Sequence, residues 1–255
     1  VPRIRQWTGM ESTAKVLVQG IAINKVNFPD SGFRKYVGFY IDTNQDDELD
    51  FSEVMSVKKI DIGEFSDFRI TDEQYAISSL RGIRFFKNLE YLDCSNNTIY
   101  DVNVSYNTKL KKLYCNDNHL TSLSLVNNHR LERLDCSNNE INKLNVTSCK
   151  SLSFLNCNNN KLGSLDLRNA RFLYSLFCRN NRLIAGNCYA VGSQLVEFDG
   201  AGQTMNVRVK RKKSGYMVKL LNLKNTNQIK RLSKGKVISN GIRISKKKLP
   251  AMITY

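Results

Sequence analysis

A cysteine recurs every 21 residues through the middle of this chain, and this repeat constrains the fold more than any other feature of the sequence. The repeated cysteines are Cys94, Cys115, Cys136, Cys157 and Cys178. Leucine recurs at the same interval five and two residues before each cysteine, and asparagine recurs three residues after it. The unit reads L-x-x-L-x-C-x-x-N-x-[LI]-x-x-[LV]-x-[LV]. Five copies in phase predict a repeat architecture with one structural unit per copy.

A single copy cannot bury its own apolar face, so the copies must stack and share one continuous core. The Leu-x-Cys stretch alternates as a β-strand does, which points both side chains inward and their neighbours outward. The repeated asparagine fits a turn in which a buried amide side chain bonds otherwise unpaired backbone groups. This pattern resembles leucine-rich repeats. It predicts an α/β repeat solenoid, a right-handed superhelix with a parallel sheet, a short helical N-terminal cap and a small β-rich C-terminal module.

The pattern divides the chain into four parts. We expect residues 1–62 to form the N-terminal cap and residues 63–88 an irregular partial repeat. Residues 89–184 hold the five repeats, and the phase is lost from about residue 185, where Gly186 replaces an apolar residue. Residues 185–255 contain short alternating stretches with glycines between them, which predicts the β-rich module.

The repeated cysteines allow two interpretations, a disulfide framework or buried free thiols. Neighbouring parallel strands lie about 4.7–4.9 Å apart with parallel side chains, whereas a disulfide needs converging Cβ atoms about 3.8 Å apart. We therefore expect free thiols that pack as small hydrophobic side chains. Cys149 and Cys188 fall outside the column. No cysteine shows a C-x-x-C spacing, so these residues indicate neither a metal site nor a redox compartment.

Residues 42–53 match the twelve-residue calcium-binding loop of an EF-hand. The predicted ligands are Asp42, Asn44 and Asp46 through their side chains, Glu48 through its backbone carbonyl, Asp50 through water and Glu53 as a bidentate carboxylate. Ca²⁺ takes about six to eight oxygen ligands, and this spacing lets one short loop surround the ion. Asp47 stands where glycine is usual, at a position that needs φ > 0, which Asp tolerates at some energetic cost.

We expect this calcium site to be single and weak, with a Kd of about 10⁻⁴–10⁻³ M, and to stiffen the cap rather than to sense calcium. The alternative is an acidic, solvated loop that holds no ion.

The order of segments resembles that of a known group of proteins. The segments are residues 27–30, 33–37, the acidic loop, 57–62, 77–89 and 91–97. Over roughly residues 20–255 they are similar to secreted leucine-rich-repeat proteins of gut Firmicutes and Bacteroidetes, in which a short helical segment with one EF-hand-like loop caps the repeats. The resemblance implies an extracellular or cell-surface bacterial protein. The chain begins at Val1 without a signal peptide, which suits a mature fragment.

The outward positions of the predicted strands line an exposed concave face. The candidate partner-binding residues there are Tyr91, Asp93, Lys112, Tyr114, Arg133, Asp135, Phe154 and Phe177. Aromatic side chains interleaved with charges favour recognition of an unknown protein or glycan, from a host or a bacterium. The alternative is that the aromatic side chains simply pack against one another along the sheet.

The charge of the chain is concentrated at its C-terminal end. Residues 200–255 hold 15 Lys and Arg and no acid, whereas residues 1–199 hold 24 basic and 23 acidic residues. A second hypothesis is therefore a polyanion- or cell-wall-binding module, with teichoic acid, anionic lipid or sulfated glycan as its partner. Its candidate residues are Lys210, Arg211, Lys212, Lys213, Lys246, Lys247 and Lys248. The alternative is that the basic segment only keeps the protein soluble, or that it forms one half of an interface with an acidic domain.

Nucleic acid is not an expected partner of this basic segment, because it shows no recognition-helix, zinc-ligand or base-stacking pattern. Catalysis is not indicated either. The two histidines, His119 and His129, fall in repeat loops, and the thiols that would pair with them are predicted to be buried. The apolar runs are shorter than the roughly 18 residues of a membrane-spanning helix. The sequence favours a non-enzymatic binding protein without a membrane span.

Overall fold

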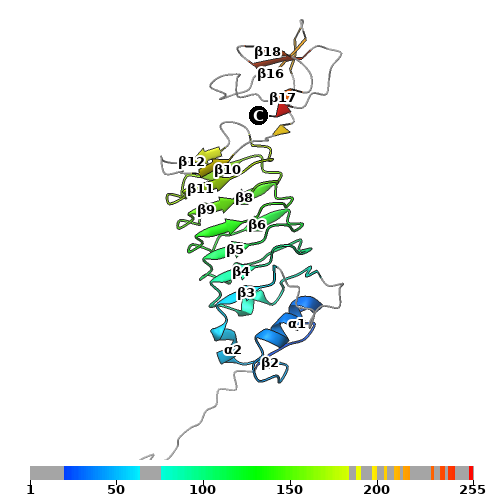
Figure 1. Cartoon of the computed structure of the whole chain (residues 1–255), viewed down its shortest axis with the longest axis vertical. Helices are drawn as coiled ribbons and strands as arrows, with labels where there is room; N and C mark the ends of the chain where they lie inside the picture. Colours follow the sequence, from blue (N-terminus) through cyan, green and yellow to red (C-terminus); the bar gives the residue numbers. More distant parts are fainter. Residues whose placement is uncertain are drawn as a thin grey trace, which may run out of the picture.

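The computed structural model describes residues 20–63 and 76–183, together with the backbone of strands β12 to β20 beyond them. It shows the leucine-rich-repeat solenoid that the sequence predicts, with parallel strands stacked one turn upon the next and a helical cap at the N-terminal end (Figure 1).

The predicted strands form one parallel sheet. Its seven strands are β3 (Lys59–Asp61), β4 (Tyr91–Asp93), β5 (Lys112–Tyr114), β7 (Arg133–Asp135), β9 (Phe154–Asn156), β11 (Ser175–Phe177) and β13 (Glu197–Asp199). Neighbouring repeats pair in register, so that Leu92 lies opposite Leu113 and Leu113 opposite Leu134. These central leucines are fully buried, and the residues on either side of them face away from the core. We call this the concave sheet.

A second parallel sheet, which the sequence analysis did not predict, runs along the other side of the core (Figure 1). Its strands are β6 (Ser122–Ser124), β8 (Lys143–Asn145), β10 (Leu165–Leu167) and β12 (Cys188–Ala190). It arises from the [LV]-x-[LV] end of the repeat, as in Leu123 and Leu125, which are buried on either side of the exposed Ser124. That alternation is itself the pattern of a half-buried strand and is the sequence signal for this sheet.

Both sheets continue past residue 184, where the sequence predicts the repeats to end. Leu165 pairs with Cys188, and Ser175 pairs with Glu197. These intervals are 23 and 22 residues rather than 21, so the sequence loses its phase while the backbone pairing persists.

A buried asparagine closes each turn, as predicted. The side-chain Nδ2 of Asn139 donates to the carbonyls of Cys115 (2.9 Å) and Cys136 (3.2 Å). It also donates to the carbonyl of Ser137 (3.0 Å), and Oδ1 accepts from the N–H of Leu120 (2.9 Å). The same four bonds recur at Asn118, Asn160 and Asn181. Each side chain thus satisfies backbone groups of its own turn and of the turn before it.

The prediction of buried free thiols is confirmed for the described cysteines. They are Cys94, Cys115, Cys136, Cys149, Cys157 and Cys178, and all are free and buried. They belong to the same buried core as the leucines of both sheets, where they add apolar volume without a large side chain.

The cap places two short helices against the first turn. Its elements are β1 (Ile21–Ala22), α1 (Ser31–Tyr40), β2 (Glu48–Leu49), α2 (Phe51–Ser56) and, next to the first repeat, the 3-10 helix η1 (Ile83–Phe85). The carboxylate of Asp30 accepts from the N–H of Phe33 (2.9 Å) and caps the start of α1. Phe33 and Val37 then point from one side of α1 into the core.

Phe28 joins the cap to the solenoid. Its ring lies 6.0 Å from that of Phe33 and 6.3 Å from that of Phe86, measured between centroids. Gly82 packs so tightly against Phe28 that a Cβ there would collide with the ring, and its φ of 108° also favours glycine. The apolar end of the core is therefore covered by aromatic side chains.

The last part of the chain is β-rich, as expected. Strands β14 (Thr204–Met205), β17 (Arg231–Leu232) and β20 (Ile253–Thr254) form one antiparallel sheet, and β15 (Lys210–Lys212), β16 (Gly215–Val218), β18 (Lys236–Ile238) and β19 (Gly241–Ile244) form another. No helix in the described part of the chain is long and apolar enough to cross a membrane.

The asparagine column makes a testable prediction about stability. Asn139→Ala removes four hydrogen bonds to buried backbone groups, and we expect it to lower the free energy of unfolding in urea by about 3 kcal/mol. Asn142→Ala is the matched control because the Asn142 side chain is exposed, and we expect a change within about 0.5 kcal/mol. Equal losses in the two variants would contradict this role of Asn139.

Candidate functional sites

The acidic loop lies between the two helices of the cap. It follows the end of α1 at Tyr40 and runs into α2, which begins at Phe51. The first and last predicted ligands, Asp42 and Glu53, are only 4% exposed although both are acids. The predicted ligands between them, Asn44, Asp46, Glu48 and Asp50, are exposed.

Glu53 is held at both carboxylate oxygens. Oε1 accepts from the N–H (2.6 Å) and the hydroxyl (2.7 Å) of Thr43, and Oε2 accepts from the N–H of Asp50 (2.9 Å). Asp50 accepts in turn from the N–H of Glu53 (2.8 Å), which makes a capping box at the start of α2. Burial raises the pKa of Glu53, but the hydrogen bonds from Asp50 and Thr43 outweigh it and hold the pKa below its usual value. Glu53 is therefore a buried anion at neutral pH.

The loop folds back over Asp42. Its Oδ1 accepts from the N–H of Gln45 (2.7 Å) and its Oδ2 from the N–H of Asp47 (3.1 Å). Asp47 has φ = 62°, which confirms the left-handed conformation expected at the position where glycine is usual.

The loop pairs with β1 rather than with a second loop of its kind. Leu49 pairs with Ile21 in an antiparallel register, and the N–H of Ile23 donates to the carbonyl of Asp47 (2.8 Å). This strand partner orders a single acidic loop. The short apolar run at residues 21–23 is the sequence signal from which this strand could have been found.

The chemistry of the loop suits a hard divalent cation. Six acids and no base lie within residues 42–53. The described ion pairs do not include Asp42 or Glu53, although both carboxylates are buried. Carboxylate, amide and carbonyl oxygens are the ligands that Ca²⁺ takes. Within the described ranges, however, no group of three or more His, Cys, Asp or Glu side chains is gathered as a metal site. Calcium therefore stays a prediction.

The concave sheet carries two pairs of aromatic rings. Tyr91 contacts Tyr114 with 5.6 Å between ring centroids, near the cap. Phe154 contacts Phe177 at the same centroid distance of 5.6 Å, two strands further along. The guanidinium of Arg133 lies 4.1 Å from the ring centre of Phe154. The rings thus pack along the sheet, as the alternative interpretation has it, but they remain half-buried and leave part of their surface to solvent.

Polar side chains occupy the sheet between the ring pairs. Asp135 accepts from Nδ2 of Asn156 (2.8 Å) and from the hydroxyl of Ser137 (2.6 Å). Asp93 accepts from the hydroxyl of Ser95 (2.6 Å). These bonds fix the carboxylates in place, whereas Lys112 is exposed.

Lys59 and Asp61 extend this face beyond the residues that the sequence analysis selected. Their Nζ and Oδ2 atoms lie 2.9 Å apart, and the Lys59 ammonium is 4.9 Å from the ring centre of Tyr91. Burial, followed by the charges of Asp93 and Asp61, raises the pKa of Tyr91 to about 12. The alternation in Lys59–Asp61 is the same strand pattern as in the repeats and is the signal that places these residues on the sheet.

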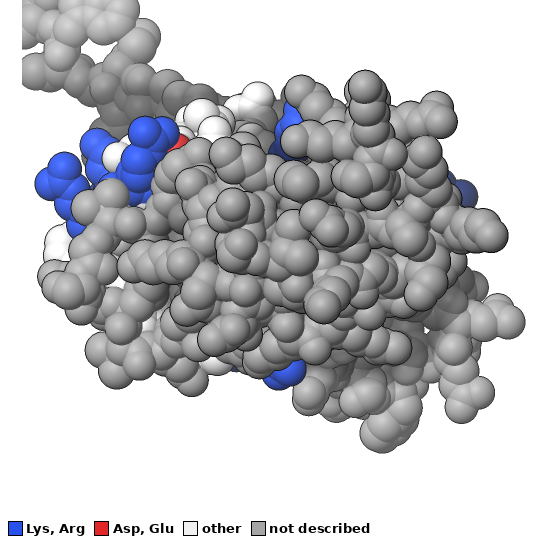
Figure 2. All heavy atoms as spheres, turned by 90° about the horizontal axis from the view of Figure 1, so that it is seen from above, with Lys and Arg blue, Asp and Glu red and all other residues white. Residues whose placement is uncertain are grey.

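The predicted polyanion residues are described only in part. Lys210, Arg211 and Lys212 form β15, which pairs with β16. Lys213 and residues 246–248 lie outside the described residues. Among the side chains that are described, the view from above shows the largest blue group of Lys and Arg at the left edge and smaller blue patches at other edges (Figure 2).

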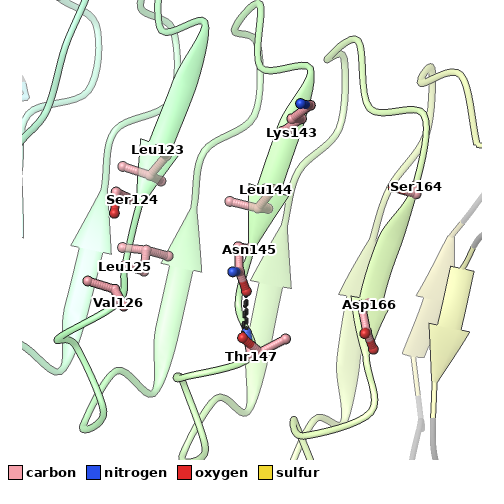
Figure 3. Close-up of a pocket in the computed structure, with 10 residues that line it drawn as sticks. All are labelled: Leu123, Ser124, Leu125, Val126, Lys143, Leu144, Asn145, Thr147, Ser164 and Asp166. Carbon is pink, nitrogen blue, oxygen red and sulfur yellow. Dashed lines mark hydrogen bonds between the residues drawn. The ribbon is translucent and has the colours of Figure 1, made fainter.

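A hollow of about 500 Å³ lies on the second sheet, across β6, β8 and β10 (Figure 3). Of the side chains that line it, Lys143 and Asp166 carry charge, and they come from different strands. Asp166 is already paired with Arg168 (2.6 Å), and Asn145 accepts from the hydroxyl of Thr147 (2.6 Å). Asn145 and Asp166 are thus engaged with residues of their own turns.

Comparison with protein-family models finds no match, and comparison with curated proteins finds none either. Solved structures do match. The functional domain of InlJ from Listeria monocytogenes, described as including a cysteine ladder, is 21% identical with a TM-score of 0.57, over 74% of this chain and 49% of that one. The chain therefore spans about half the length of this neighbour.

Two other bacterial structures are similar to smaller degrees. An internalin, InlF, from Listeria monocytogenes is 22% identical with a TM-score of 0.47, over 65% of this chain and 54% of that one. A leucine-rich-repeat protein from Leptospira interrogans is 26% identical with a TM-score of 0.40, over 42% and 29%. The likeness to InlJ supports the leucine-rich-repeat fold.

The cysteine column makes a prediction about thiol chemistry. Burial raises the pKa of Cys94, Cys115 and Cys136 in the column, and raises that of Cys149, outside the column, to about 12. These thiols carry little thiolate at pH 8, and all six described cysteines are buried away from reagents. In a Cys188→Ser chain we expect no fast reaction with dithiobis(nitrobenzoate) at pH 8 or 9, and reaction of the six described cysteines in urea. A thiol that reacts fast in the folded chain would contradict this and would restore a thiol-dependent enzyme as a hypothesis.

Proposed function

We propose that this chain is a non-enzymatic binding protein, secreted by or held on the surface of a bacterium, that recognises a protein or glycan partner through its concave sheet. The observation that carries the proposal is the pair of half-buried aromatic contacts on that sheet, Tyr91 with Tyr114 and Phe154 with Phe177. Strands about 4.8 Å apart set the two ring pairs roughly 14 Å apart, with charged side chains between them. This arrangement suits a partner with two apolar anchors that flank a polar stretch.

The rigidity of the face supports this role. The sheet residues are tied together by the ring contacts, by the Arg133 guanidinium over Phe154 and by the Asp135–Asn156 bond. Side chains that are already ordered lose little conformational entropy when a partner binds. Aromatic and arginine side chains also supply most of the energy at protein interfaces. The likeness in fold to InlJ, a protein of Listeria monocytogenes, supports a bacterial source.

We also propose that the acidic loop binds Ca²⁺ as a structural ion. Asp42, Asn44, Asp46, the Glu48 carbonyl and Glu53 would hold it, with Asp50 acting through water. The ion would supply positive charge beside two buried carboxylates and would stiffen the cap.

A second candidate function rests on the charge of the C-terminal segment. Its 15 basic residues without an acid favour an anionic polymer, bound through Lys210–Lys212 and the neighbouring lysines. Binding of this kind falls steeply with salt because it depends on exposed charges.

Binding through the concave sheet is tested by capture from host mucosal extract and from bacterial wall polymers, at low and high salt with calcium present. We expect Phe177→Ser to weaken salt-resistant capture at least tenfold, because the residue is an aromatic anchor on the sheet. Phe172→Ser is the matched control, since Phe172 is 67% exposed in the turn before β11, and it should leave capture unchanged. Two results together would contradict this proposal and favour the basic segment as the binding site. They are loss of capture at high salt and loss of capture when residues 210–213 are replaced with glutamine.

Calcium binding is tested by unfolding in 10 mM CaCl₂ against 10 mM MgCl₂. For a Kd of about 10⁻³ M, we expect calcium to raise the free energy of unfolding by about 1.4 kcal/mol. Asp42→Asn should abolish the gain while it retains the shape of the side chain. Glu132→Gln, at an exposed acid outside the loop, should keep the gain. An unchanged unfolding free energy in the unsubstituted chain would contradict the calcium proposal.

A further inference from the structure

A second concave site lies at the N-terminal end of the solenoid, away from the concave sheet. It is a pocket of about 510 Å³ bounded by residues 26–27 of the cap, the turn at 78–84 and residues 100–106 of the first repeat. Asn103, which lines it, pairs with Ser124 of β6, so the pocket belongs to the side of the second sheet. Three separate segments border it, and several of the side chains that line it are exposed, so it is a recess that opens to solvent.

Two arginines give the pocket its charge. Arg81 and Arg84 both line it and are exposed, and in the described part of the chain neither guanidinium is paired with a carboxylate. Asp101 is the acid among the lining residues. Burial and the nearby charge of Arg84 lower the pKa of Lys87, which adjoins the pocket. The two arginines therefore outnumber the one acid of the lining. A guanidinium group binds a carboxylate or sulfate through two parallel hydrogen bonds.

Two tyrosines give the same pocket flat apolar surfaces. Tyr100 is 66% exposed and Tyr106 is 55% exposed, and both line the recess. The Tyr106 ring lies 4.3 Å below the ammonium of Lys87, and the Tyr100 ring lies 5.1 Å from that of His119. Neither ring belongs to the buried core, so both leave surface open to solvent at the pocket. Flat aromatic faces stack against the C–H faces of sugar rings.

The turn that bears the arginines is pre-organised. Asp30 Oδ2 accepts from the N–H and hydroxyl of Ser78 (both 2.9 Å) and from the N–H of Ser79 (3.3 Å). Gly82, between the two arginines, is locked against Phe28 with φ = 108°. The turn is therefore already ordered before a ligand binds, so binding costs little conformational entropy.

We propose that this pocket binds an anionic sugar, a pyranose that carries a carboxylate or a sulfate. The arginines would hold the anionic group and the tyrosines the ring. The volume of the pocket, which is within the range of small-ligand pockets, and its two exposed rings favour a sugar over an acidic peptide. This site is separate from the concave sheet and from the basic C-terminal segment.

The test is calorimetric titration of the full chain at 0.15 M salt with four probes: a hyaluronan tetrasaccharide, a sulfated chondroitin tetrasaccharide, a neutral N-acetylglucosamine tetramer and a tetraglutamate peptide. We expect one or both anionic sugars to bind at least tenfold more tightly than the other two probes. Arg81→Gln with Arg84→Gln should weaken that binding at least tenfold, as should Tyr100→Ala with Tyr106→Ala. All four side chains are exposed, so these variants should fold.

The matched control is Arg130→Gln with Arg171→Gln, which removes the same charge from exposed positions outside the pocket and should change affinity less than twofold. An equal loss in the control would show general electrostatic attraction and overturn the site. Equal affinity for the tetraglutamate peptide would overturn the sugar in favour of an acidic peptide. If neither anionic sugar binds at millimolar concentration, the proposal is overturned. Because Phe177→Ser leaves this pocket intact, failure here and failure of concave-sheet recognition are distinguishable.

Discussion

Every turn of this solenoid depends on one buried asparagine side chain. At the corner after each strand of the concave sheet, backbone groups face the core, where water cannot reach them. The amide of Asn139 meets four of these groups, and two of them, on Cys115 and Leu120, belong to the preceding turn. The side chain therefore joins neighbouring repeats and also stabilises the turn of its own repeat. Each repeat in such an array is stabilised by its interfaces with the neighbouring repeats. The stability of the array therefore depends on the contacts that hold the first turn.

The cap holds that first turn and also carries two of the candidate sites. Phe28 seals the end of the core against Phe86, and Asp30 both caps α1 and fixes the turn at Ser78. The acidic loop and the arginine-lined pocket are thus built on the same rigid base. Their geometry is supported by core packing rather than by loop conformation alone, which is what a binding site with low ordering cost requires.

The periodic features were predictable from the sequence, and the features that depend on non-periodic segments were not. A five-fold repeat fixes the concave sheet, the asparagine column and the thiols, and the need for positive φ at Asp47 follows from the loop motif alone. The second sheet is the exception, because its [LV]-x-[LV] alternation recurs with the same period and its strands are as long as those of the concave sheet. The pairing of β1 with the acidic loop and the meeting of Arg81 with Tyr100 join segments whose spacing follows no repeat, so only the folded chain reveals them.

The column of free cysteines imposes an order on the events of folding. Once the repeats are stacked, the thiols are sealed from oxidants. Before stacking, the same thiols are exposed on one chain, and an oxidising medium joins them at random. Any such bridge within the column opposes the parallel arrangement of side chains on stacked strands. In an oxidising environment, the repeats must therefore stack faster than disulfides form. A molecule that unfolds there and forms such a bridge cannot refold until a reductant breaks the disulfide.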